Sequence, residues 1–141
     1  PTHNYPTQMG SQIRAHYVDW VHSHCEPGSD SDTWGESVSA DVVVMMSLAE
    51  RITMGKVVAE SKFQEDAEAY RETGGDPDRI CDLLVNSQRE SEVIELARHL
   101  ARIYEFDEDQ AAAMFEWIIR TTIFVEVSYL QMRIREGRDE T

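Results

Sequence analysis

Four residues that could bind a metal ion recur at every third position near the start of the chain. They are His16, Asp19, His22 and Cys25. Imidazole, carboxylate and thiolate groups are the side-chain ligands of Zn²⁺ and related divalent ions. On a helix each step of three residues falls about 60° short of a full turn, so no more than three of them could converge on one ion. The pattern allows a divalent metal site, with an ordinary polar helix face as the alternative.

One carboxylate stands out in the most apolar part of the chain, residues 111–132. The helical neighbours of Glu126 include Ile123, Tyr129 and Leu130, so we expect Glu126 to be buried. Burial raises the pKa of a carboxyl group, and buried carboxyl groups occur at general acids and metal sites. The alternative is a structural role, in which Glu126 pairs with Tyr129 or with an arginine from another helix.

A cluster of acidic side chains forms a third candidate site. It consists of Glu65, Asp66, Glu68 and Glu72, which we expect to lie largely on one face of a helix. Neighbouring carboxylates on a helix lie about 5–6 Å apart at Cβ, a spacing similar to that of successive phosphates. Such a face could imitate a nucleic acid and inhibit a basic DNA- or RNA-binding enzyme. A solvated helix face and the general acidity of a salt-adapted protein are the alternatives.

The chain as a whole is strongly acidic. Its 141 residues include 27 Asp and Glu but only 13 Lys and Arg, which gives a formal net charge of −14. Proteins that bind nucleic acids gain most of their non-specific affinity from Lys and Arg at phosphates. The charge therefore argues against direct binding of DNA, RNA or anionic membrane surfaces.

Motifs that would identify an enzyme are absent from the sequence. It has no glycine-rich phosphate loop, nucleophile elbow, paired CxxC or HExxH, and it lacks the two Glu-x-x-His repeats of a ferritin-like di-metal site.

Two cysteines, Cys25 and Cys81, do not make a disulfide framework, and we see no signal peptide. Glu116, Arg120 and Glu126 interrupt the most apolar stretch, which argues against a membrane span. We expect a cytoplasmic protein.

Helices must position these side chains. Apolar residues at helical spacing predict a helix over 11–24, a second from residue 40 to the stop at residues 73–75, and a last one over 108–136. Between them we expect a short helix capped by Asp76 and a fourth that opens with a capping box at Ser87 and Glu90. The fold class is therefore all-α, a single-domain bundle of about five helices with a long apolar C-terminal helix.

The last helix has apolar side chains on every side, which indicates either the central rod of a bundle or a surface covered by a second subunit. Its candidate subunit interface consists of Ile118, Val125 and Met132. We expect a flexible arm at 1–10, a helical domain at 11–136 with a loop at 26–39, and a flexible tail at 137–141.

These features favour a non-catalytic, acidic interaction or regulatory protein that acts through contacts with a protein partner. A homodimer is one form that such contacts could take. One alternative is a nucleic-acid-mimicking inhibitor, and another is a metal-binding helical-bundle enzyme. No cofactor is expected, apart from a divalent ion if the metal site forms.

Overall fold

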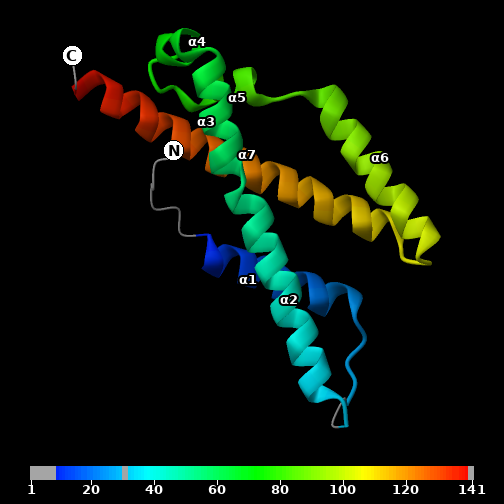
Figure 1. Ribbon diagram of the computed structural model, residues 1–141. Helices are drawn as coiled ribbons and strands as arrows, with labels where there is room; N and C mark the ends of the chain where they lie inside the picture. The colour runs from blue at the N-terminus through cyan, green and yellow to red at the C-terminus, as the bar shows by residue number, and fades with distance from the viewer. Residues whose placement is uncertain (1–8, 30–31, 140–141) are drawn as a thin grey trace. The chain divides into compact units, whose positions relative to one another are not determined.

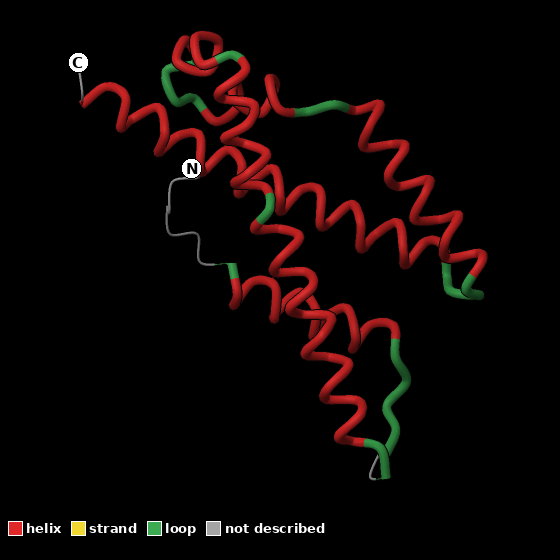
Figure 2. Tube along the Cα trace, viewed as in Figure 1, coloured by secondary structure: helices red, strands yellow, loops and turns green. Residues whose placement is uncertain are grey.

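The computed structural model describes residues 9–29 and 32–139, and the regular structure within them is entirely helical (Figures 1 and 2). Helix accounts for 84% of the structure, which confirms the all-α class. The described residues fall into two compact units, one within residues 6–51 and one within residues 52–141. The candidate site below is built from the second unit alone.

The first unit contains α1 (Gly10–His24) and all but the last two residues of α2 (Trp34–Thr53). Ile13 and Tyr17 of α1 are buried, and the Tyr17 hydroxyl donates a 2.6 Å hydrogen bond to Oδ1 of Asp41 on α2. The predicted loop at 26–39 is shorter than expected, because α2 already begins at Trp34.

The second unit contains α3 (Gly55–Glu65), α4 (Ala67–Glu72), α5 (Pro77–Leu84), α6 (Ser87–Ile103) and α7 (Glu108–Asp139). Helix α7 contacts all four of the others, and Figure 1 shows α6 running along its first half. The core is formed by Ala59, Phe63, Tyr70, Ile80, Leu84, Tyr129, Leu130 and Ile134. This arrangement makes α7 the element against which the rest of the unit is packed.

The long second helix that we predicted is three helices, so the described residues contain seven helices instead of about five. Met54 separates α2 from α3 although its own backbone stays in the right-handed helical region, with φ −58° and ψ −20°. The chain leaves helical geometry at Asp66, where φ is −147° and ψ is 69°. The Asp66 carboxylate accepts a 3.1 Å hydrogen bond from the backbone N–H of Ala69 and so caps α4. Aspartate competes with the helix for backbone groups in this way, which explains the break.

The starts of α1, α5, α6 and α7 were predicted correctly or within one residue, whereas α2 begins at Trp34, six residues before the predicted start. Oδ1 of Asp76 accepts bonds from the backbone N–H groups of Asp78 and Arg79, as expected for its cap. For α6 the cap is Asn86, one residue before the predicted Ser87, and its side chain accepts a 3.0 Å bond from the N–H of Arg89.

The proposed subunit interface on α7 requires correction. Ile118 is 8% exposed and Val125 is 1% exposed, and Met132 packs against the core of its own unit. Ile118 and Val125 are covered by the chain's own helices, since α3, α4, α5 and α6 all contact α7. These two side chains therefore leave no exposed surface for a second subunit, and Met132 is partly covered.

Parts of the predicted arm and tail lie outside the described residues, namely 1–8 and 140–141. Within the described part, α7 continues to Asp139 and so includes residues that we assigned to the tail. None of the described helices is long and apolar enough to cross a membrane.

Candidate functional site

The site is organised by a close crossing of α3 and α7 at Gly55. A β-carbon at this position would lie 2.9 Å from Cγ2 of Thr122, 3.2 Å from the Thr122 carbonyl oxygen and 3.3 Å from Cγ of Glu126. Glycine is therefore what allows the start of α3 to lie against α7 at this point. The side chains of Thr122 and Glu126 are held at this contact.

Three polar side chains are buried where α3 and α7 meet. Glu60 and Glu126 are each 6% exposed, and Thr122 is 8% exposed. The Thr122 hydroxyl donates a 2.7 Å hydrogen bond to the carbonyl oxygen of Ile118. Burial of a carboxylate is costly unless other groups compensate its charge and its hydrogen-bonding capacity. We call the set Gly55, Glu60, Thr122, Glu126 and Tyr129 the α3–α7 seam.

The compensation is visible for Glu60. The Tyr129 hydroxyl donates a 2.7 Å hydrogen bond to Oε2, and Nε2 of Gln64 donates a 2.9 Å bond to Oε1. Nε of Arg133 lies 3.4 Å from Oε2, within ion-pair distance. Both carboxylate oxygens of Glu60 therefore have partners.

Two guanidinium groups lie near one end of the seam. The Cζ atoms of Arg133 and Arg71 lie 4.9 Å and 5.5 Å from the centroid of the Phe63 ring. The faces of aromatic rings attract cations. Positive charge is therefore held beside the buried carboxylate of Glu60.

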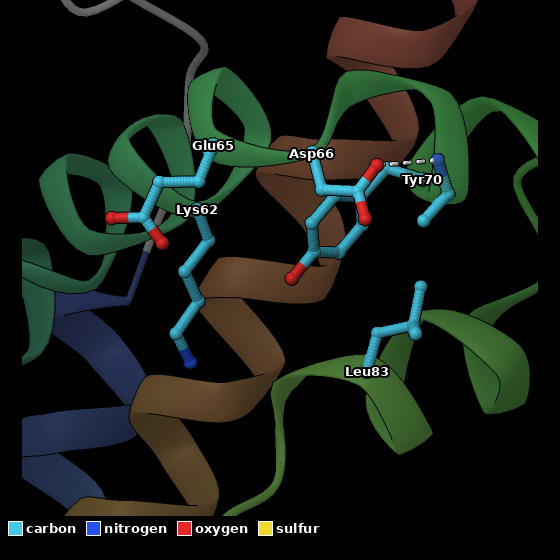
Figure 3. A pocket seen from close by; sticks show the side chains of 6 residues that line it. Lys62, Glu65, Asp66, Tyr70 and Leu83 are labelled. Atoms are coloured by element: carbon cyan, nitrogen blue, oxygen red, sulfur yellow. Dashed lines mark hydrogen bonds between the residues drawn. The ribbon is translucent and has the colours of Figure 1, made fainter.

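A pocket of about 270 Å³ opens beside the seam (Figure 3). Its lining comes from α3, α4, α5 and the turn between α3 and α4, and consists of Lys62, Glu65, Asp66, Ala69, Tyr70 and Leu83. The Lys62 ammonium donates a 3.0 Å hydrogen bond to the carbonyl oxygen of Leu84. An ammonium has three N–H donors, and this bond uses one of them.

Electrostatics connect the pocket to the seam. Burial raises the pKa of the Tyr70 phenol, and the negative charge of Glu126 raises it further, followed by the charges of Asp66 and Glu65. Tyr70 therefore keeps its proton at neutral pH and can donate a hydrogen bond. The Lys62 ammonium and the Tyr70 phenol of the pocket, with the Thr122 hydroxyl and the Glu126 carboxylate of the seam, form a set suited to a small polar ligand.

The predicted metal site does not form. The described part of the chain includes His16, Asp19, His22 and Cys25. Within it, no group of three or more His, Cys, Asp or Glu side chains is placed to hold a metal ion. Helix α1 continues to His24, so His16, Asp19 and His22 point in different directions around it. Cys25 is in an extended conformation, with φ −109° and ψ 133°.

The acidic cluster is divided by the break at Asp66, so the single helix face that we expected does not exist. Glu65 ends α3, Asp66 caps α4, and Glu68 and Glu72 belong to α4. All four side chains are exposed, but only Glu65 and Asp66 line the pocket.

Glu126 is buried, as predicted from its apolar neighbours in the sequence. Lys62, Tyr70 and Thr122 were not predicted as site residues. A signal existed for Thr122, because it precedes Glu126 by four residues and so shares its helix face in an otherwise apolar stretch. No local signal joins Lys62 to Leu83 and Leu84, since only the packing of α5 brings the end of that helix to Lys62.

Comparison with known proteins gives the family. The family model described as chorismate mutase type II matches residues 36–127, which is more than half of the chain. The chain therefore belongs to the chorismate mutase type II family. The matched range includes Gly55, Lys62, Tyr70, Thr122 and Glu126, so it contains most of the seam and the pocket.

Individual relatives agree with this assignment. The chorismate mutase of Schizosaccharomyces pombe is 29% identical over 95% of this chain and 60% of its own length. That of Saccharomyces cerevisiae is 30% identical over 77% of this chain and 48% of its own length. The crystal structure of Aro7p chorismate mutase from Candida albicans in complex with L-Trp matches with a TM-score of 0.82 and 27% identity, over 96% of this chain and 60% of that one. The chain thus spans about half to three fifths of the length of these relatives.

The family assignment corrects our prediction of function. A non-catalytic interaction or regulatory protein is contradicted by membership of a family that is named for an enzyme. The mimicry alternative is withdrawn on the same finding. Acidity and the lack of a short catalytic motif pointed away from an enzyme, because the residues of this site are spread over α3, α4 and α7 and form no short motif.

Proposed function

We propose that this chain carries the catalytic centre of a chorismate mutase and converts chorismate into an isomer. The observation that carries the proposal is the pocket beside the α3–α7 seam, where Lys62 lines the hollow and Glu126 acts electrostatically on Tyr70. Membership of the chorismate mutase type II family supports the same conclusion.

The chemistry of the substrate fits these side chains. Chorismate is a small dicarboxylate with a ring hydroxyl and an enol ether, so its binding needs at least one cation and several hydrogen-bonding groups. Lys62 supplies a cation for a carboxylate, the protonated Tyr70 supplies a donor, and Glu126 supplies an acceptor for a hydroxyl. A pocket of about 270 Å³ is near the small end of the range for ligand sites, as a compact metabolite requires.

A mutase transfers a group within one molecule, so substrate and product contain the same atoms. The work left to the protein is to hold the reacting ends together and to stabilise charge that develops between them. The Lys62 ammonium is fixed by its bond to the Leu84 carbonyl oxygen, and the Glu126 carboxylate is buried. Both groups suit this task, because neither has to reorganise during the reaction.

The experiment is to measure conversion of chorismate by the 141-residue chain and by the variants Lys62→Met and Glu126→Gln. We expect the wild-type chain to be active and Lys62→Met to lose about 10²-fold or more in kcat/KM, as removal of one electrostatic contact to a reacting group typically does. Arg79→Met removes an exposed cation of α5 and should leave the rate unchanged. An inactive wild-type chain, or full activity in Lys62→Met, would overturn the proposal.

We also propose that the protein acts in the cytoplasm as a homodimer and works without a resident cofactor. Support for self-association comes from the exposed apolar side chains of α6, where Leu96, Leu100 and Ile103 are 56%, 44% and 58% exposed. Light scattering coupled to size exclusion, with elemental analysis of the same peak, tests the oligomeric state and the absence of a metal ion. A monomer at micromolar concentration or a stoichiometric metal ion would contradict these features.

A further inference from the structure

A polar cluster around the buried carboxylate of Glu60 shares the α3–α7 seam with Glu126 but does not line the pocket. It consists of Glu60, Gln64, Tyr129 and Arg133, which we call the Glu60 cluster. The carboxylate of Glu60 is at its centre, with bonds of 2.7 Å to the Tyr129 hydroxyl and 2.9 Å to the Gln64 amide and a 3.4 Å contact to Arg133. The binding chemistry proposed above does not use any of these four side chains.

The contacts of the Glu60 cluster differ in kind from those of the surrounding core. Ala59, Phe63, Leu130 and Ile134 are buried and apolar, so their packing is not directional. A hydrogen bond weakens steeply as its angle departs from linearity, and a buried carboxylate that loses a partner pays a desolvation cost. The bond from Tyr129 to Glu60 therefore penalises rotation and sliding of α7 against α3 more than the apolar contacts do.

Helix geometry links this bond to the candidate site. At 100° per residue, Thr122, Glu126, Tyr129 and Arg133 all lie within a sector of about 60° on α7. Tyr129 is only about 4.5 Å further along the helix axis than Glu126. A rotation of α7 by about 20° would move a group 6 Å from its axis by about 2 Å, and a displacement of about 1 Å can cost 10²-fold in rate.

We propose that Glu60 is a positioning residue, whose hydrogen bond from Tyr129 holds α7 at the rotation that places Glu126 in the α3–α7 seam, where its charge acts on Tyr70 of the pocket. This inference rests on the proposed function. Glu60 acts through Tyr129 and α7 and does not touch the substrate. Its role is distinct from that of Gly55, which permits the close approach of the two helices but does not set their rotation.

The test is a double-mutant cycle between Tyr129→Phe and Glu126→Gln. If Tyr129 acts by positioning Glu126, Tyr129→Phe should lower kcat/KM about tenfold in the wild-type background and less than about twofold in the Glu126→Gln background, because a group that has been removed cannot be misplaced. Its effect on the thermal midpoint should be equal in both backgrounds. Tyr104→Phe removes a hydroxyl from a tyrosine that is 78% exposed and serves as the matched control.

The same tenfold loss in both backgrounds would overturn the proposal, since a purely structural role does not depend on Glu126. A second comparison covers the other end of the bond. Glu60→Gln keeps an oxygen that can accept from Tyr129 and should retain most of kcat/KM, whereas Glu60→Ala should lose about tenfold. Equal losses in these two variants would also refute the positioning role.

A readout without turnover separates this inference from the proposed function. The carboxyl carbon resonance of Glu126 can be assigned by its disappearance in Glu126→Gln. We expect this resonance to shift in Tyr129→Phe and to stay in place in Tyr104→Phe. If the wild-type chain does not convert chorismate, the proposed function fails while the resonance still tests the position of Glu126. If the chain is active and the resonance does not move, only the inference about Glu60 fails.

Discussion

A β-carbon placed on Gly55 would lie 2.9 Å from Cγ2 of Thr122, closer than side chains approach one another in folded proteins. The Thr122 carbonyl oxygen would be 3.2 Å away and belongs to the backbone of α7, so it cannot move aside without shifting that helix. This one contact sets the distance between α3 and α7 where the buried polar side chains of the site meet.

Gly55→Ala should therefore destabilise the protein in spite of alanine's better helix propensity. We expect a loss of about 1–3 kcal/mol in the free energy of unfolding, the usual cost of overpacking a core. Urea denaturation followed by circular dichroism provides the measurement. Gly35→Ala in α2 is the control, because its added β-carbon would meet nothing within 4 Å beyond its own stretch of helix, and it should be neutral or stabilising. Equal effects of the two substitutions would contradict the close crossing.

Truncation of two adjacent residues of α7 should destabilise the protein by different amounts. Val125 is 1% exposed and Phe124 is 56% exposed. Val125→Ala leaves a cavity in the packed interior and should cost about 2 kcal/mol, while Phe124→Ala should cost less than about 1 kcal/mol although it removes more atoms. Thermal unfolding of both variants tests the assignment of the buried face. A larger loss from Phe124→Ala would mean that the face is assigned wrongly.

The pocket contains acidic groups that oppose an anionic substrate. Glu65 lines the pocket with Lys62, and the whole chain carries a net charge of −14. Glu65→Gln removes one repulsive charge and should lower KM for chorismate by about twofold to fivefold at low ionic strength, with little change in kcat. Glu68→Gln removes an exposed charge outside the pocket and should have a much smaller effect. If both variants change KM equally, the effect arises from net charge and not from the pocket.

The bond between Tyr17 and Asp41 predicts a loss of stability at high pH. Burial, the hydrogen bond to Asp41 and the charge of Asp41 raise the pKa of Tyr17 from its ordinary value of 10.0 to about 12. Because the folded state keeps the proton when the unfolded state has lost it, the stabilisation is complete below pH 10 and is lost as the pH rises from 10 to 12. Wild-type protein should thus lose more unfolding free energy across this window than Tyr17→Phe does. Denaturation at a series of pH values measures the difference, and parallel curves would refute the raised pKa.

Local chemistry explains what could be predicted of the fold. Asp76 followed by proline, and Asp107 three residues before Gln110, are capping patterns that act within a few residues of chain. Asp76 and Asp107 do accept bonds from the backbone N–H groups that follow them. The spacing of apolar residues gave the all-α class for a similar reason, since a helix repeats its contacts every three or four residues. The break at Asp66 was missed because an aspartate on a helix surface and an aspartate cap have the same local sequence signature.

The sequence by itself determined that this chain is helical, where most helices begin, and that Glu126 is set among apolar neighbours. Only the tertiary structure decided which polar groups share a site. Tyr129 reaches Glu60 across 69 residues, and Lys62 meets the end of α5 across 22. It also decided that Ile118 and Val125 are covered by the chain itself, and that His16, Asp19, His22 and Cys25 do not gather around an ion. The physical reason is that helix formation depends on neighbours in sequence, whereas burial, pKa and site geometry depend on the packing of helices that are distant in sequence.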